Sequence, residues 1–221
     1  MQGSLRIGTR PSPLALKQVE EIQRIFASLH FSAIVIPTPG DRDKLTPLGG
    51  LEGSDFFTRD IDQALLAGEI DLGIHSSKDL PDPLAKGLGL VFETPSLSPH
   101  DALVSRWGLR LDELPVGWRM GTSSRRRKEQ VGILRPDLKI IEIRGNIAER
   151  LDLIEAGVID ALIVAHAAML RLGLESKVSQ VLPLDRFLVH PRQGKLVLLA
   201  KEARCAEIRS ILSAQARVTG S

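Results

Sequence analysis

Polar and cationic side chains follow several apolar runs of this 221-residue chain, at the point where each run ends. In α/β sheets, ligands bind beyond the carboxyl ends of the strands, where helix N-termini present free N–H groups. This rule collects Arg10, Ser12, Ser76, Ser77, Lys78, Thr122, Ser123, Ser124, Arg126, Arg127, Arg144, Gly145 and Arg150. Because guanidinium groups bind oxyanions in bidentate geometry, the set predicts a ligand that bears several carboxylates or phosphates.

One carboxylate, Asp79, follows Lys78 directly and lies amid these predicted cations. One interpretation is structural, with the carboxylate capping a helix or pairing with Lys78 or an arginine of the site. The other is chemical, because a carboxylate in a strand-end loop can act as an acid or base, or stabilise a cation. The residue types leave both interpretations open.

Nucleotides and metals are disfavoured by motifs that the sequence lacks. It has no GxxxxGK[ST] loop and no GxGxxG after a strand. Its five histidines show no metal-ligand spacing, so no metal site is predicted. We interpret His75 and His166 as packed residues rather than catalytic ones.

The run Arg125–Lys128 concentrates positive charge in a chain whose net charge is only +2. Such a run forms a solvated face, a nucleic-acid patch or part of an anion site. Aromatic residues make up 4% of the chain and Tyr is absent, which disfavours a protein that stacks bases on aromatic platforms. We expect no nucleic-acid partner.

Alternating strands and helices must position these residues. Strands are predicted at 5–9, 32–37, 70–75, 118–123, 138–144, 159–165 and 195–200. Helices are predicted to begin at Ser12-Pro13 and at Ser54, the latter ending at Gly68, and to span 124–134, 146–156 and 202–215. This alternation indicates parallel sheets covered by helices.

The two halves of the chain are similar to each other. The block LRIGT at 5–9 parallels WRMGT at 118–122, and AGEID at 67–71 parallels AGVID at 156–160. Two matches in the same order favour two similar α/β domains facing each other across a cleft. Pro and Ser cluster within 94–101, and a second crossing is expected near 190–194. We therefore predict domain 1 over 1–96 and 191–221, and domain 2 over 97–190.

The composition, 43% hydrophobic and 25% charged, is that of an ordinary globular protein. A single cysteine, Cys205, fits a reducing compartment and excludes a Cys-rich zinc module. The N-terminus lacks a signal-peptide h-region, and the longest apolar stretch, 161–170, falls far short of the roughly 20 residues that span a bilayer. We expect a cytoplasmic protein with no membrane partner.

Several motifs, taken in order, resemble the porphobilinogen deaminase family, also called hydroxymethylbilane synthase. The matching blocks are RIGTRPSPLAL at 6–16, DLGIHSSKDLP at 71–81, GTSSRRR at 121–127, RGN at 144–146 with Arg150, RLGL at 171–174 and QG at 193–194. The resemblance covers roughly residues 5–200. Several separate motifs in order are much more specific than any one of them.

The resemblance implies an enzyme of tetrapyrrole (haem) biosynthesis that condenses four porphobilinogen molecules into linear hydroxymethylbilane and releases ammonia. Each pyrrole carries an acetate and a propionate, which accounts for an arginine-lined site. Asp79 would be the catalytic carboxylate that assists loss of the aminomethyl nitrogen and stabilises cationic intermediates. The implied binding residues are Arg10, Ser12, Gln18, Ser76, Lys78, Thr122, Ser123, Ser124, Arg126, Arg127, Arg144, Gly145, Arg150, Arg171 and Gln193. Among them, Thr122 and Ser124 match positions that contact the family's dipyrromethane cofactor.

The resemblance also implies a monomer with a periplasmic-binding-protein-like pair of α/β domains, and it has departures. The family has a third, C-terminal α+β domain whose cysteine holds dipyrromethane through a thioether, and we expect that domain to be absent here. Cys205 lies in a predicted helix, so we interpret it first as a buried small hydrophobe and second as the attachment site. Smaller departures are Ser54-Asp55, Arg125 and Arg192, which replace a Lys-Gly, a Leu and a small residue.

A non-catalytic tetrapyrrole or polycarboxylate binding protein is the alternative function, because two-domain α/β clefts also bind solutes. The predicted carboxylate at Asp79 favours the enzyme, since a site that only binds carboxylates gains nothing from an anion. The expected absence of the third domain favours the binding protein.

Overall fold

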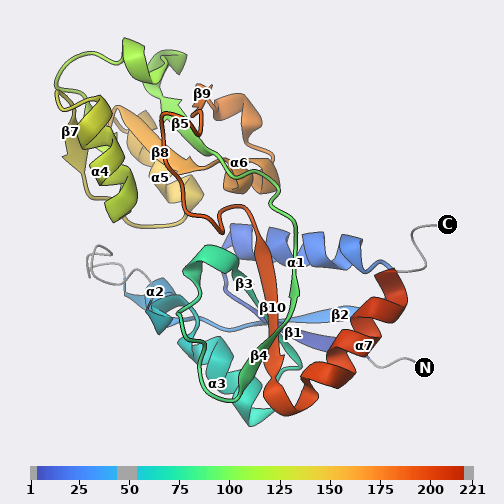
Figure 1. The fold of residues 1–221 in the computed structure, drawn as a ribbon. Helices are drawn as coiled ribbons and strands as arrows, with labels where there is room; N and C mark the ends of the chain where they lie inside the picture. The colour runs from blue at the N-terminus through green and yellow to red at the C-terminus, as the bar shows by residue number, and fades with distance from the viewer. Residues whose placement is uncertain (1–3, 44–53, 217–221) are drawn as a thin grey trace. The chain divides into compact units, whose positions relative to one another are not determined.

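The protein, seen in a computed structural model that describes residues 4–43 and 54–216, divides into two α/β units (Figure 1). The first unit contains the described residues of Met1–Asp43, Gly53–Pro95 and Lys195–Ser221, and the second contains Ser96–Gly194. The chain thus enters the second unit after Pro95 and leaves it after Gly194. The domain boundary predicted from the sequence placed Gln193 in the first domain, whereas it lies in the second unit.

A five-stranded sheet with the order β2-β1-β3-β10-β4 forms the centre of the first unit. Its strands are β1 (Leu5–Thr9), β2 (Phe31–Val35), β3 (Leu72–Ser76), β4 (Leu88–Glu93) and β10 (Leu196–Lys201). Strand β1 is parallel to β2 and β3, whereas β10 is antiparallel to β3 and β4. The expectation of a purely parallel sheet is therefore wrong. The returning chain enters β10 at Leu196, opposite Ser76 at the carboxyl end of β3, and has to run the other way.

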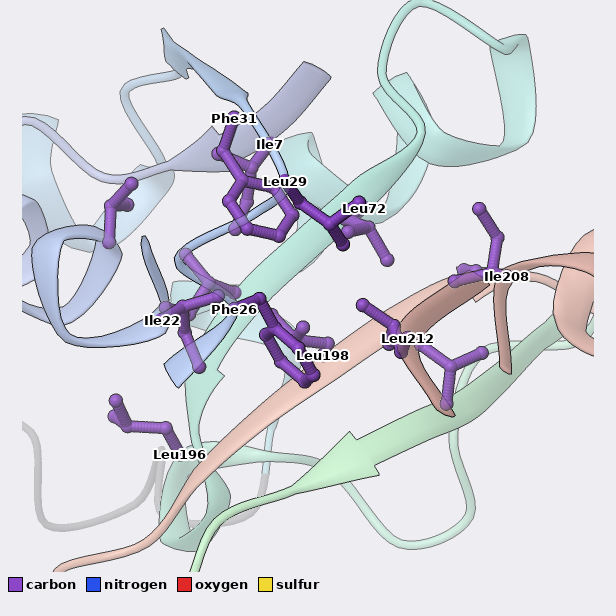
Figure 2. Packing of buried hydrophobic residues seen from close by; sticks show 14 of the residues in the cluster. Ile7, Ile22, Phe26, Leu29, Phe31, Leu72, Leu196, Leu198, Ile208 and Leu212 are labelled. Atoms are coloured by element: carbon purple, nitrogen blue, oxygen red, sulfur yellow. The ribbon is translucent and has the colours of Figure 1, made fainter. Parts of the chain in front are cut away.

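Helices cover both faces of this sheet. Helices α1 (Pro13–Ile25) and α7 (Cys205–Ala216) pack on one face and α3 (Arg59–Ala67) packs on the other, whereas α2 (Pro39–Arg42) has no buried residue. Along β10, Leu196 and Leu198 pack in a cluster with α1 and α7, whereas Val197 and Leu199 pack with α3, as the two-residue period of a strand requires. Figure 2 shows the first of these clusters, in which Leu198 lies with residues of α1 and α7.

The second unit has a five-stranded sheet with the order β7-β6-β8-β5-β9. Its strands are β5 (Asp101–Ser105), β6 (Arg119–Gly121), β7 (Lys139–Ile141), β8 (Ala161–Ala165) and β9 (Gln180–Val181). Strand β6 is parallel to β7 and β8, and β5 is antiparallel to β8 and β9. Helix α4 (Arg125–Leu134) contributes to one core cluster, and α5 (Ile147–Glu155) and α6 (His166–Leu172) contribute to another.

Local signals in the sequence located most helix ends. Ser12 accepts a hydrogen bond from the Ala15 amide and caps α1, and Gly68 ends α3 with a φ of 79°. The single helix predicted from Ser54 is wrong, because Ser54 caps a separate 3-10 turn, Asp55–Phe57, and α3 begins only after Thr58. Within residues 4–43 and 54–216, the other 3-10 turns are Ser77–Asp79, Arg106–Gly108, Leu111–Glu113, Glu175–Lys177 and Glu202–Arg204.

The internal repeat is confirmed by topology and by matching contacts. In the first unit the backbone N and Nε of Arg6 donate to Asp71 Oδ2 at 2.9 and 3.0 Å. In the second, the same two atoms of Arg119 donate to Asp160 Oδ2 at 2.9 and 2.8 Å. Each pair joins the first parallel strand of its unit to the residue before the third, so the two units share one architecture.

The Arg6–Asp71 pair also depends on Arg204, whose Nη1 lies 2.5 Å from Asp71 Oδ1. Burial alone would raise the pKa of Asp71, but hydrogen bonds from Arg6 and Arg204 outweigh it and lower that pKa to about 2. A carboxylate whose pKa falls on folding stabilises the fold at pH values above its pKa in the unfolded chain. That contribution is lost as the pH drops through its pKa in the folded state.

We expect Asp71→Asn to lower the free energy of unfolding near pH 7 by about 1–2 kcal/mol, less than the full pKa shift implies because solvent screens the partly exposed pair. The difference should shrink as the pH falls from about 4 toward 2. Urea unfolding at neutral and acidic pH measures it, with Glu69→Gln, an exposed carboxylate of the same unit, as control. A difference that stays constant with pH would contradict this account of Asp71.

Candidate functional site

In the first unit, β1 and β3 are parallel neighbours, so the residues that follow them lie at one edge of the sheet. This edge carries Arg10 and Ser12 after β1, and Ser76 with the turn Ser77–Asp79 at the end of β3. Gln18 of α1 donates from Nε2 to Ser76 Oγ at 3.1 Å. The structure therefore brings two predicted ligand residues, Gln18 and Ser76, into direct contact.

Two buried residues, Ser77 within the turn and Leu80 directly after it, hold the turn Ser77–Asp79. The charged side chains of the turn are partly exposed. Ser77 is 1% exposed, and its backbone N donates to Lys195 O at 3.0 Å. Leu80, which follows the turn, is also buried. Lys78 and Asp79 are partly exposed. In the part of the chain that the structure describes, no side chain forms an ion pair with Asp79. Asp79 is thus a partly exposed carboxylate whose charge no described side chain neutralises in an ion pair.

Arg10 is oriented by a carboxylate that the sequence analysis did not single out. Its Nη2 lies 2.5 Å from Asp41 Oδ1, and its guanidinium lies 4.5 Å from the centre of the Phe57 ring. Burial tends to raise the pKa of Asp41, but hydrogen bonds from Arg10 and Thr38 lower it below its usual value. The only signal in the sequence was Thr38 three residues before Asp41, a capping pattern.

His75 is a packed residue on the core side of this edge. Its side chain is 3% exposed, and its Nε2 lies 3.8 Å from Asp62 Oδ1. Burial, with a smaller effect of the Arg10 charge, lowers the pKa of His75 to about 3, so the ring is neutral near pH 7. Burial likewise raises the pKa of Asp62 to about 6. This agrees with the interpretation of His75 as a structural residue.

In the second unit, α4 begins at the carboxyl end of β6 and presents its N-terminus there. Thr122 and Ser123 are 1% and 2% exposed. Their hydroxyls hold the loop, since Ser123 Oγ bonds both backbone groups of Ile143 and Thr122 Oγ1 accepts from the Ser124 amide. The Ser124 side chain makes no capping bond to α4. The positive end of α4 is therefore open to an anion.

The start of α5 differs, because its own residues cap it. Asn146 Oδ1 accepts from the Glu149 amide at 3.1 Å, and Glu149 Oε2 accepts from the Asn146 amide at 2.7 Å. Gly145 has a φ of 100°, and a Cβ there would lie 2.6 Å from Glu149 Oε2, so the turn requires glycine. Arg150 Nε donates to Gly145 O at 2.8 Å and is oriented by the same turn. Arg144 precedes this turn and is partly buried.

Arg127 and Gln193, both predicted to bind ligand, direct their hydrogen bonds into the unit. Arg127 Nη2 and Nε lie 2.6 and 3.0 Å from the two carboxylate oxygens of Asp101, which is 2% exposed. Gln193 Nε2 also donates to Asp101 Oδ1 at 2.8 Å, and to Pro99 O and His100 O at 3.0 Å each. Both residues thus fasten the entering and leaving segments of the unit.

Asp101 was not among the predicted site residues. Its position directly before the apolar residues 102–104 was the available signal, because a carboxylate that opens a buried strand needs a cationic partner. Arg171 has a similar anchoring contact, since its Nη2 donates to Gly194 O at 2.9 Å where the chain leaves the unit. Arg126, in contrast, is exposed on α4.

We expect Arg127→Met to lower the free energy of unfolding by about 3–5 kcal/mol, because it leaves the buried Asp101 carboxylate without its cation. Arg126→Met, one position earlier on the same helix, should change it by no more than about 0.5 kcal/mol. Chemical denaturation of the two variants measures the difference. Equal stability of both would show that the Arg127–Asp101 pair is not structural.

Cys205 lies away from this edge. It begins α7 after the end of β10, and β10 runs antiparallel to β3, so Cys205 is at the opposite end of the sheet from Ser76. The residue is 7% exposed within the core cluster, and a Cβ on Gly89 would lie 2.6 Å from its Sγ. Its position matches the small-hydrophobe interpretation. A buried thiol at this end does not present itself for thioether formation.

Among the described residues, no three His, Cys, Asp or Glu side chains form a group that could hold a metal ion. Within the same ranges, no helix has both the length and the apolar character to cross a bilayer.

Comparison with known proteins decides the family. Residues 5–208 match the family model described as porphobilinogen deaminase, dipyromethane cofactor binding domain. This chain belongs to the porphobilinogen deaminase family. The porphobilinogen deaminase of Rubrobacter xylanophilus is 42% identical over 96% of the chain, and that of Syntrophus aciditrophicus is 39% identical over 90%. The family description also supports the predicted dipyrromethane cofactor.

This chain is shorter than the family members it matches. It spans 71% of the Rubrobacter protein, 66% of the Syntrophus protein and 62% of the porphobilinogen deaminase of Geotalea uraniireducens. The matches therefore establish the family, whereas the activity of this chain is a separate question.

Solved structures confirm the predicted fold class. The methionine binding protein MetQ matches with a TM-score of 0.60 at 14% identity, covering 96% of this chain and 89% of its own. The VFT2 domain of Bordetella pertussis BvgS matches with a TM-score of 0.56 at 14% identity, covering 99% and 88%. At such identities the similarity concerns the fold alone, which is the two-domain α/β type expected from the sequence.

Proposed function

We propose that this chain acts as a hydroxymethylbilane synthase, which condenses four porphobilinogen molecules into linear hydroxymethylbilane and releases four ammonia molecules. The observation that carries the proposal is Asp79, a partly exposed carboxylate on the turn after β3 with no ion-pair partner among the described residues. The predicted ligand residues around it are cations and neutral polar groups. A site that only bound carboxylates would be weakened by an anion at this position.

The reaction places a defined demand on that carboxylate. In each addition the aminomethyl C–N bond breaks and ammonia leaves, a C–C bond forms to the free α-carbon of a second pyrrole, and that carbon loses its proton. Water supplies the hydroxyl group of the released product. Positive charge develops on the pyrrole as ammonia leaves, and Asp79 stabilises it in the transition state more than in the substrate.

The edge of the second unit fits the dipyrromethane that the family description names. A dipyrromethane built from two such pyrroles carries several carboxylates, and the residues at this edge are cations next to an uncapped helix N-terminus. Ser124, Arg126, Arg144 and Arg150 would hold it. When bound, the group supplies the pyrrole carbon to which the first substrate is joined.

We expect Asp79→Asn to lower kcat by about 100-fold or more while porphobilinogen binding is largely kept, because the lost interaction acts in the transition state. Porphobilinogen consumption and bilane formation by the purified protein measure it, with Asp112→Asn, an exposed carboxylate of the other unit, as control. If wild-type protein bound porphobilinogen and left it unchanged, the non-catalytic binding protein would be the correct alternative.

We further propose that dipyrromethane is held without a covalent bond to Cys205, since this thiol is buried at the end of the sheet opposite Ser76. The intact masses of wild-type protein and Cys205→Ser should then both equal their sequence masses under denaturing conditions. An added dipyrromethane mass in wild-type protein would contradict this. Its loss in Cys205→Ser would identify the attachment site.

A further inference from the structure

Three side chains join the Asp79 turn to the strands next to it, and two of them, those of Glu93 and Lys195, were not among the predicted site residues. Ser77 Oγ donates to Glu93 Oε1 at 2.7 Å, and Lys195 Nζ donates to Glu93 Oε2 at 3.0 Å. Glu93 is the last residue of β4, and Lys195 is the residue before β10. We call Ser77, Glu93 and Lys195 the relay.

The two strands next to the relay, β4 and β10, are joined to each other by hydrogen bonds. Next to it, the Thr94 amide donates to Leu196 O and the Leu196 amide donates to Thr94 Oγ1, each at 2.9 Å, so β4 and β10 are locked together there. The Ser77 amide bonds to Lys195 O at 3.0 Å. The turn is therefore tied to Lys195 twice, through the backbone and through the Glu93 side chain.

The bond between Ser77 and Glu93 is the contact whose loss would matter most. Ser77 is 1% exposed, and Glu93 supplies the acceptor for its hydroxyl. Hydrogen bonds to an ionised acceptor are roughly twice as strong as neutral ones. Lys195 Nζ forms an ion pair with Glu93 at 3.0 Å and balances its charge next to the turn.

We propose that Glu93 is a positioning residue for Asp79 and acts through Ser77. The inference rests on the proposed role of Asp79. Ser77 and Asp79 belong to one 3-10 turn of three residues, so a displacement of Ser77 displaces the catalytic carboxylate. Because the charge that Asp79 stabilises exists only in the transition state, misplacement lowers kcat and leaves KM nearly unchanged.

We expect Glu93→Ala to lower kcat for porphobilinogen by about 10- to 100-fold with little change in KM. Glu93→Gln keeps an oxygen that can accept from Ser77 and should recover part of this loss. Glu20→Ala, which removes the exposed Lys17–Glu20 pair of the same unit, is the matched control and should leave kcat unchanged. Unchanged kcat in Glu93→Ala would overturn the proposal.

A double-mutant cycle tests whether Glu93 acts through Ser77. If it does, the double variant Ser77→Ala with Glu93→Ala loses no more kcat than the more damaging single variant. Losses that multiply would mean that the two residues act independently, which contradicts the relay.

A third measurement separates failure of the relay from failure of the proposed function. If wild-type protein does not consume porphobilinogen, the proposed function is wrong, and hydrogen exchange of the Ser77 amide still tests the relay. Exchange should be faster in Glu93→Ala than in wild-type protein, because the turn has lost its side-chain anchor. Equal exchange would show that Glu93 does not hold the turn.

Discussion

In each unit, the ion pair between an arginine on the first parallel strand and an aspartate just before the third determines where the functional residues lie. Arg6 and Asp71 form this pair in one unit, and Arg119 and Asp160 form it in the other. The arginine donates from both its backbone N and its guanidinium, so the pair fixes the register of strands as well as their contact. The residues that follow the strands at the opposite end depend on this register.

A second constraint concerns charge. Cations meant for an anionic ligand repel one another, and a carboxylate placed among them orients a cation but also neutralises it. Arg127 forms an ion pair with buried Asp101, and Arg10 forms one with Asp41. The protein therefore orients these two guanidinium groups. Arg126 lies exposed on the first turn of α4. The consecutive arginines 126 and 127 therefore have different surroundings, which their residue type alone does not distinguish.

Local signals in the sequence predicted much of the fold, and the elements that were not predicted have identifiable physical reasons. Strand 5–9, the cap at Ser12 and the stop at Gly68 were predicted correctly because each depends on neighbouring residues. Strands β4 and β5 were not predicted, and the antiparallel direction of β10 depends on where the chain returns from the second unit. Helix α6 follows β8 within one continuous apolar run, so the sequence showed no junction. The partners of Arg10 and Arg127 lie 31 and 26 residues away, beyond the reach of motif spacing.

The anchoring of Asp79 follows from the same conflict between orientation and charge. A catalytic carboxylate must be held within a fraction of an ångström, and a direct ion pair would hold it but would weaken its field at the substrate. The structure holds the turn at Ser77 instead, where an uncharged hydroxyl bonds to Glu93 and the charge of Glu93 is balanced by Lys195. The ion pair between Glu93 and Lys195 thus contacts the turn at Ser77, two residues before Asp79. Under the proposed function, position is fixed through the backbone of the turn, and the negative charge of Asp79 remains available to the reacting pyrrole.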